Sequence, residues 1–104
     1  MLVLSRRRSE SIEVDHDILV KVSDIYGQQY QGKVDIEIAM PGQPINRLRG
    51  MIAGDVFTLA ENITAKIIRV KADVGQVQIG IDAPKNISIW RTELLPIVER
   101  RITA

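Results

Sequence analysis

The chain has 104 residues, of which 45% are hydrophobic and only 4% aromatic, and its formal net charge is +1. This length suits one small domain or two very small ones, with a core built from Val, Ile and Leu. The chain has no cysteine, which excludes disulfides, thiolate metal sites and cysteine nucleophiles and fits a reducing compartment. No apolar run approaches roughly 18 residues, so we expect no transmembrane helix. The short apolar start precedes its arginines, unlike a signal peptide, and these features together predict a cytoplasmic protein.

The chain begins with an apolar run, Leu2–Leu4, that leads almost directly into Arg6, Arg7 and Arg8. The run favours a β-strand, and arginines at the end of a strand match phosphate oxygens and guanine edges. The alternative is a solvated edge strand whose charges discourage aggregation. Because the net charge of the whole chain is small, any surface for nucleic acid must be a local patch such as this one.

Residues 9–14 predict a second strand after a polar turn. Ile12 and Val14 share one face and Glu13 points to the other, which is the alternation of a half-buried strand. The next turn contains the only histidine, His16, between two aspartates. Three adjacent residues in a turn seldom converge on one ion, and no second cluster of ligands is present, so we expect no metal site.

A third strand is predicted from Ile18, where apolar and polar residues alternate as far as Val22. The next apolar residue is Ile25, so the phase slips by one position. A bulge or the end of the strand near residues 23–24 would explain this slip. A loop bounded by glycines, residues 27–32, is expected to follow.

A fourth strand is predicted at residues 34–38, where apolar residues alternate with outward acidic ones. The two prolines within residues 40–44 interrupt the ladder, because proline lacks the N–H donor. Residues 45–50 carry Arg47 and Arg49 at a spacing of two. This last segment is compatible with a strand that has a basic face.

The second half of the chain resembles the first. Phe57, Leu59, Ile63, Ala65 and Ile67 each follow an apolar residue of the first half by 45 positions, namely Ile12, Val14, Ile18, Val20 and Val22. The phase slip recurs before Val70, and the apolar positions 77–81 follow those of residues 34–38 by 43. We therefore expect a tandem duplication, with one repeat at residues 1–50 and another at residues 51–104, intertwined as one globular unit.

The chain closes with a predicted strand at residues 87–91 and a short helix from Glu93 to about Arg101. Thr92 can cap this helix, and Pro96 falls in its first turn, where proline is tolerated. Basic residues near the helix end suit its dipole. The expected fold class is therefore all-β, mostly antiparallel and barrel-like, with a short C-terminal α-helix.

Both ends of the chain are similar to one known family. The opening MLVLSRR and the closing segments Val77–Lys85, Ile87–Arg91 and Glu93–Leu94 resemble the carbon storage regulator (CsrA/RsmA) family. The resemblance implies a small bacterial β-protein without a cofactor, which binds GGA-containing hairpin loops in mRNA leaders and modulates translation initiation or mRNA stability, often as a repressor. It also implies small regulatory RNAs and a flagellar assembly factor as partners.

The family is normally an intertwined homodimer, and the first strand of one subunit lies beside the last strand of the other to form each RNA site. By resemblance, the first-strand half of the site consists of Leu4, Ser5, Arg6 and Arg7. Arg8 matches no residue specific to the family, and we expect it to contact phosphate. The last-strand half consists of Ala83, Pro84, Lys85, Ile87, Ile89, Trp90 and Arg91. Trp90 has two interpretations, a packed anchor of the core or a surface on which a base stacks.

The chain departs from the family in its length and at the junction of the repeats. Met51 and Ile52 fall where Arg6 and Arg7 stand in the first repeat. Residues 45–52 would also have to be the last strand of one repeat and the first of the next, and neighbouring parallel strands need a long connection. We therefore expect a single-chain pseudo-dimer with one working site. The alternative is one domain, interrupted by an insertion from residue 15 to about residue 59, that forms an ordinary dimer.

Two other function classes are considered. One is a protein-interaction module or antagonist related to this family that has lost most RNA binding, although arginines in both halves of the site favour RNA. The other is an enzyme. The sequence contains no Ser/His/Asp set, P-loop, paired-carboxylate motif or zinc spacing, so we expect no catalysis.

Overall fold

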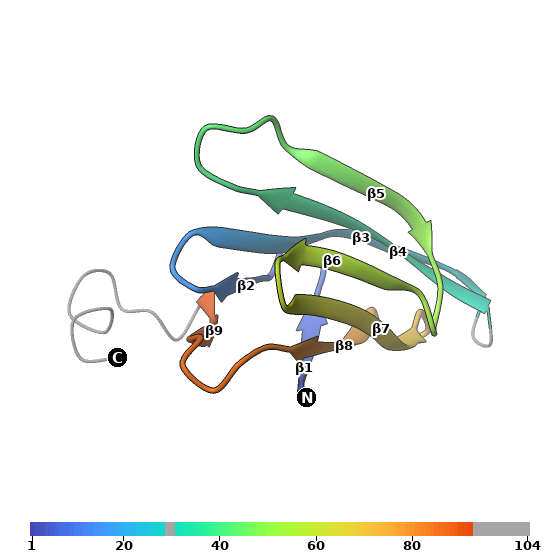
Figure 1. Ribbon diagram of the computed structural model, residues 1–104. Coiled ribbons are helices and arrows are strands. Elements are labelled where there is room, and N and C mark those ends of the chain that lie inside the picture. Colours follow the sequence, from blue (N-terminus) through green and yellow to red (C-terminus); the bar gives the residue numbers. More distant parts are fainter. Residues whose placement is uncertain (29–30, 93–104) are drawn as a thin grey trace.

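The computed structural model describes residues 1–28 and 31–92, which form nine strands in two antiparallel sheets (Figure 1). Sheet A has the strand order β1-β8-β7-β6, and sheet B has the order β5-β4-β3-β2-β9. The strands are β1 (Leu2–Arg7), β2 (Ser11–Val14), β3 (Ile18–Gln28), β4 (Gln31–Ala39), β5 (Asn46–Met51), β6 (Val56–Ala60), β7 (Ile63–Lys71), β8 (Gln76–Asp82) and β9 (Ile89–Arg91). The predicted all-β class is confirmed, whereas the helix predicted from residue 93 lies outside the described residues. Within the part of the chain that is described, no helix is long and apolar enough to span a membrane.

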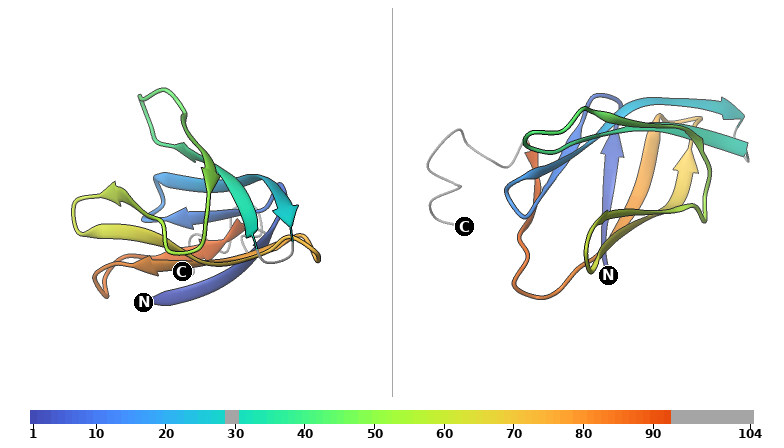
Figure 2. Two further views of the ribbon diagram at one scale, coloured as in Figure 1. Left: turned by 90° about the vertical axis from the view of Figure 1, so that its right-hand side faces the viewer. Right: turned by 45° about the horizontal axis from the view of Figure 1, so that its top comes forward.

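Each sheet combines strands from distant parts of the chain. β1 forms an edge of sheet A beside β8, with Leu2 opposite Ile81 and Arg7 opposite Gln76. β9 forms an edge of sheet B beside β2, where Arg91 is opposite Ile12. Figure 2 shows β1, in blue, next to the orange β8 in both views. The N-terminal strand therefore completes the sheet made from the second half of the chain, and β9 completes the sheet made from the first half.

Aliphatic side chains from both sheets form one core. The long strands β3, β4, β7 and β8 alternate buried and more exposed residues over most of their length. The fully buried side chains include Ile12, Ile36, Ile67, Ile79 and Ile81, and burying each contributes about 1.5–3 kcal/mol. The apolar positions predicted from alternation all lie in this core, so that prediction is confirmed.

Both predicted phase slips are shifts in the register of a sheet. The pairing of β3 with β4 shifts within residues 22–24, and the pairing of β7 with β8 shifts within residues 67–69. An extra residue at a bulge turns the strand, so the apolar series resumes on its original face. Ile25 and Val70 accordingly return to the core.

The expected loop at residues 27–32 is a tighter hairpin than predicted. β3 continues to Gln28 and β4 begins at Gln31, with Gly27 opposite Gly32 in the ladder. Gly27 has φ +100°, a conformation that side chains disfavour. The glycines therefore permit the strands to continue almost to the tip instead of bounding a loop.

Two further predictions need correction, because the last strand is shorter than predicted and Glu13 is buried. The last strand contains only Ile89–Arg91, because the amide of Ile87 donates to the carbonyl of Pro84 (3.0 Å) and forms a turn instead. Glu13 is only 2% exposed, although alternation placed it outward. Its cross-strand neighbours Leu19 and Trp90 flank it on that face, and such neighbours lie close enough to cover a side chain.

Gly32 lies where the two sheets approach each other closely. A Cβ atom at this position would lie 2.6 Å from Cγ1 and 2.9 Å from Cβ of Val70, a core residue on β7. We expect Gly32→Ala to lower the free energy of unfolding by about 1–3 kcal/mol through overpacking, as measured by urea denaturation. Val70→Ala removes Cγ1, the closer of the two side-chain atoms, and leaves Cβ in place, so the cost of Gly32→Ala should shrink in that background without disappearing. Strictly additive effects in the double mutant would contradict this account.

Candidate nucleic-acid interface

The first and last strands end at the same place, the start of β2. The carbonyl oxygen of Ser11 accepts hydrogen bonds from Nη1 of Arg6 and from Oγ1 of Thr92, each at 3.3 Å. Thr92 directly follows β9, and Arg6 lies near the end of β1. The two strands belong to different sheets and do not pair with each other. One backbone acceptor thus connects the two segments that the sequence assigned to one site.

Arg6 faces the interior. Its exposed fraction is 4%, its Nε donates to the carbonyl of Ser5 at 2.8 Å, and its Nη2 lies 3.7 Å from Oε1 of Glu10. A buried guanidinium is costly unless such partners satisfy it. The sequence predicts a direct RNA contact for Arg6, but its geometry is that of a residue that positions the start of β2 against β1.

The next two arginines point to different parts of the surface. Arg7 is exposed, and its Nη1 donates to the carbonyl of Val74 in the turn between β7 and β8 (3.1 Å). Arg8 forms an ion pair with Asp24 on β3, with Nη2 and Oδ1 2.8 Å apart. Among the described residues, the guanidinium of Arg7 donates to this one carbonyl, although it carries five N–H donors. Arg8 has a carboxylate partner that a phosphate would have to displace.

The predicted last-strand residues follow β1 from one end to the other. Ala83 comes just after β8, whose Ile81 is opposite Leu2 at the beginning of β1. Pro84 and Lys85 are exposed in the connection to sheet B, and β9 then brings Arg91 to the neighbourhood of Ser11 and the end of β1. Ile87 and Ile89 pack against the core. Leu4 on β1 is also a core residue, while Ser5 is half-buried.

Trp90 contributes a buried polar atom to this region. Its Nε1 is buried and has no hydrogen-bond partner among the residues that the structure describes. An indole N–H usually finds an acceptor when it is buried, and leaving it unpaired costs about 1–3 kcal/mol. The burial fits the interpretation of Trp90 as a packed anchor, and stacking on a base stays a prediction.

β5 holds the position in sheet B that β1 holds in sheet A, because each is an edge strand antiparallel to its neighbour. Arg6 is opposite Val77 in one ladder, and Met51 is opposite Val34 in the other. Arg47 on β5 is held by Glu37, with Nε and Oε2 3.3 Å apart. Met51 therefore occupies in sheet B the position that Arg6 occupies in sheet A, so no arginine stands there to bond to a carbonyl as Arg6 bonds to Ser11.

Comparison with known proteins places the chain in a family. The model described as "Global regulator protein family" (CsrA) matches residues 1–47 and again residues 53–100. The chain belongs to the CsrA family. Each half of this CsrA-family chain thus carries its own match.

Several curated relatives support this membership. The chain is similar to the translational regulator CsrA of Desulforamulus reducens, with 28% identity over 100 residues, which are 96% of this chain and 66% of the relative. It is 40% identical over 47 residues to the translational regulator CsrA of Nocardioides sp. and 44% identical over 46 residues to the translational regulator CsrA of Caldicellulosiruptor bescii. These shorter matches cover 54% and 56% of the relatives and 45% and 44% of this chain. No solved structure gives a significant match.

The sequence did not identify the groups that bring the two ends of this CsrA-family chain together. The acceptor is a backbone carbonyl, which every residue possesses, so the identity of Ser11 carries no signal. The sequence predicts Thr92 as a helix cap, whereas its hydrogen bond to Ser11 depends on the pairing of β9 with β2. Glu10, which accepts a hydrogen bond from the amide of Arg7 at 2.7 Å, was recognisable only as a turn residue.

Proposed function

We propose that this CsrA-family chain is a sequence-specific RNA-binding, post-transcriptional regulator that holds GGA-containing hairpin loops at one composite site between β1 and β9. The observation that carries the proposal is the shared carbonyl of Ser11, to which both Arg6 and Thr92 donate. Around it lie Arg7 and Arg91, from the two segments that resemble the family's RNA site. Exposed loops splay their bases, and guanidinium and backbone donors can bond to the guanine edges. The name translational regulator, which the relatives bear, supports the regulatory part of the proposal.

We also propose that the two repeats, residues 1–50 and 51–104, take the place of the two subunits expected for this family. The two matched segments and the exchange of β1 and β9 between the sheets support this proposal. A second site would need a last strand beside β6, but β6 pairs only with β7 among the described strands. It would also need an arginine where Met51 stands. One RNA per chain is the consequence.

One titration tests both parts. A GGA-loop hairpin and the same hairpin with a scrambled loop are titrated with the protein, and the mass of the complex is measured by analytical ultracentrifugation. We expect a clear preference for GGA, a protein monomer, and one RNA per chain. Equal binding of the two loops would refute sequence-specific recognition. A tight protein dimer that binds two RNAs, with first and last strands supplied by different chains in mixed-mutant complementation, would refute the pseudo-dimer.

The second candidate function is a protein-interaction module that has lost RNA binding. The burial of Arg6 and the ion pair of Arg8 favour this candidate, because the sequence predicted that both arginines would contact RNA. A log–log slope of affinity against salt near zero would support it, since each phosphate neutralised on a single strand contributes about −0.7.

A further inference from the structure

The outer face of sheet A carries a row of cations on β7, which we name the β7 strip: Lys66, Arg69 and Lys71. Lys66 and Arg69 are exposed and Lys71 is half-buried. The bulge within residues 67–69 creates this row. Side chains alternate between the two faces of a strand, so residues 66 and 69 would point to opposite faces in a regular strand. The extra residue of the bulge brings both to the outer face.

The β7 strip shares this face with the exposed side of β1. Lys71 and Arg7 are both opposite Gln76, one from each side of β8, and Arg69 and Ser5 are both opposite Gln78. Residues directly opposite each other in a sheet point to the same face. Two strand spacings separate β7 from β1, or roughly 10 Å. The strip therefore lies beside the first-strand half of the proposed RNA site.

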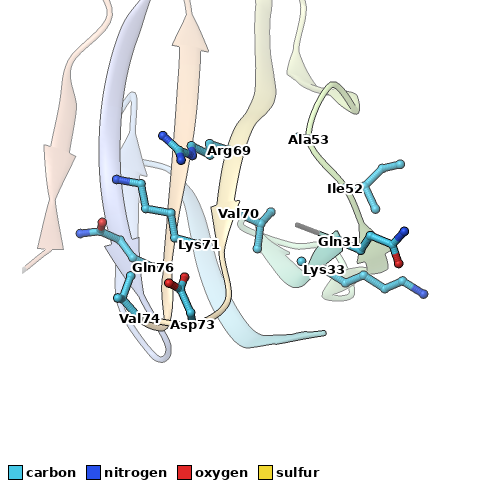
Figure 3. A pocket seen from close by; sticks show the side chains of 11 residues that line it. Gln31, Lys33, Ile52, Ala53, Arg69, Val70, Lys71, Asp73, Val74 and Gln76 are labelled. Carbon is cyan, nitrogen blue, oxygen red and sulfur yellow. The ribbon is translucent and has the colours of Figure 1, made fainter. Parts of the chain in front are cut away.

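Within the described part of the chain, no carboxylate is paired with a cation of the β7 strip. The residues opposite these cations on β8 are Gly80, Gln78 and Gln76. Figure 3 shows the side chains of Arg69 and Lys71 extending in the same direction from β7, away from Lys33. Arg69, Lys71 and Lys33 line a cavity of about 860 Å³, together with one carboxylate, Asp73 in the turn after β7. The cavity lies next to Arg7, because Val74, to which Arg7 donates, is part of its lining.

The outer face of sheet B is different. Lys21 is opposite Glu37, and Asp35 accepts hydrogen bonds from Oη of Tyr26 and from the amide of Gly50, each at 2.8 Å. The hydrogen bond to Asp35 is the main cause of a raised pKa for the Tyr26 hydroxyl. Carboxylates thus offset the cations on this face, so of the two outer faces the one beside β1 is better suited to a polyanion.

We infer that the β7 strip binds phosphate groups of the RNA that flanks the hairpin loop, which extends the site formed by β1 and β9. This inference rests on the proposed function and adds a second contact region to it. Lys66 and Lys71 are five positions apart, or roughly 17 Å along a strand, so the strip can follow several consecutive phosphates. The strip contains no aromatic side chain on which a base could stack. Its contribution is therefore electrostatic, independent of sequence and sensitive to salt.

The test compares two triple variants that lower the net charge equally. Lys66→Gln/Arg69→Gln/Lys71→Gln removes the β7 strip, and Lys21→Gln/Arg47→Gln/Arg49→Gln removes the same number of cations from sheet B. Each protein is titrated with a minimal GGA hairpin, with the same hairpin carrying single-stranded flanks, and with a version that has a longer stem. Thermal unfolding curves identify any variant that is no longer folded. The two extended RNAs distinguish single-stranded from duplex phosphates as the ligand.

We expect an extension to increase the affinity of the wild type and of the sheet B variant. The variant without the β7 strip should lose this gain, by up to about 100-fold near 0.1 M salt, with a log–log salt slope shallower by about 2. Its affinity for the minimal hairpin should match that of the wild type. An undiminished gain in this variant, or an equal loss in the sheet B variant, would overturn the inference and leave the proposed function intact. If the wild type binds none of the hairpins, the proposed function itself fails.

Discussion

Replacement of Arg91 by alanine should weaken the binding of a GGA-loop hairpin by about 5- to 150-fold, or about 1–3 kcal/mol, if the guanidinium contacts a base edge. Arg91 lies in β9 opposite Ile12, next to the Thr92 hydroxyl that bonds to Ser11. It is partly exposed, so alanine should remove a ligand contact with little effect on the core. Fluorescence anisotropy at one fixed salt concentration measures the change.

The matched controls are Arg47→Ala and Arg49→Ala, which remove the same charge from the edge strand β5. Both should change the affinity much less than Arg91→Ala. Arg47 is already paired with Glu37, and their strand has Met51 where β1 has Arg6. If either control weakened binding as strongly as Arg91→Ala, the single-site proposal would be wrong. If only the affinity for scrambled loops fell, Arg91 would not read the loop sequence.

The second large effect is expected at Arg6, and it concerns stability. Arg6→Ala should lower the free energy of unfolding by about 2–4 kcal/mol, because it removes a buried guanidinium together with the hydrogen bonds that it donates. The affected acceptors are the carbonyls of Ser5 and Ser11. Arg6→Lys keeps the charge but lacks the fork of donors, so it should lose somewhat less. Urea denaturation followed by the fluorescence of Trp90, the sole tryptophan, provides the measurement.

Arg7→Ala separates the roles of the two neighbouring arginines. Arg7 is exposed, and surface substitutions usually change stability by less than about 0.5 kcal/mol. We expect this variant to unfold like the wild type and to bind the hairpin more weakly. Arg6→Ala should bind weakly mainly because its fold is impaired. A stable Arg6→Ala protein with impaired binding would instead make Arg6 a direct contact.

The sequence alone determined the strands and the core of this protein. Positions such as Val34, Ile36 and Ile38 alternate with polar residues because a strand with one buried face needs an apolar residue at every second position. The slips before Ile25 and Val70 were visible for the same reason, since one extra residue breaks this period of two. The similarity of both ends to the CsrA family likewise depended only on the order of residues.

Only the tertiary structure decided where the charged side chains point. Arg6, Arg7 and Arg8 are adjacent in the sequence, yet their side chains point to three different places. Arg6 is buried and bonds to Ser11, Arg7 is exposed and bonds to Val74, and Arg8 pairs with Asp24. These directions depend on which strand lies next to β1 and on the turn into β2, and both result from contacts between distant parts of the chain. The slip before Val70 indicated the bulge of the β7 strip, but the position of the strip beside β1 follows only from the pairing of β8 with both β1 and β7. Local periodicity specifies burial along one strand, but the surfaces available to a ligand arise from the pairing of strands far apart in the sequence.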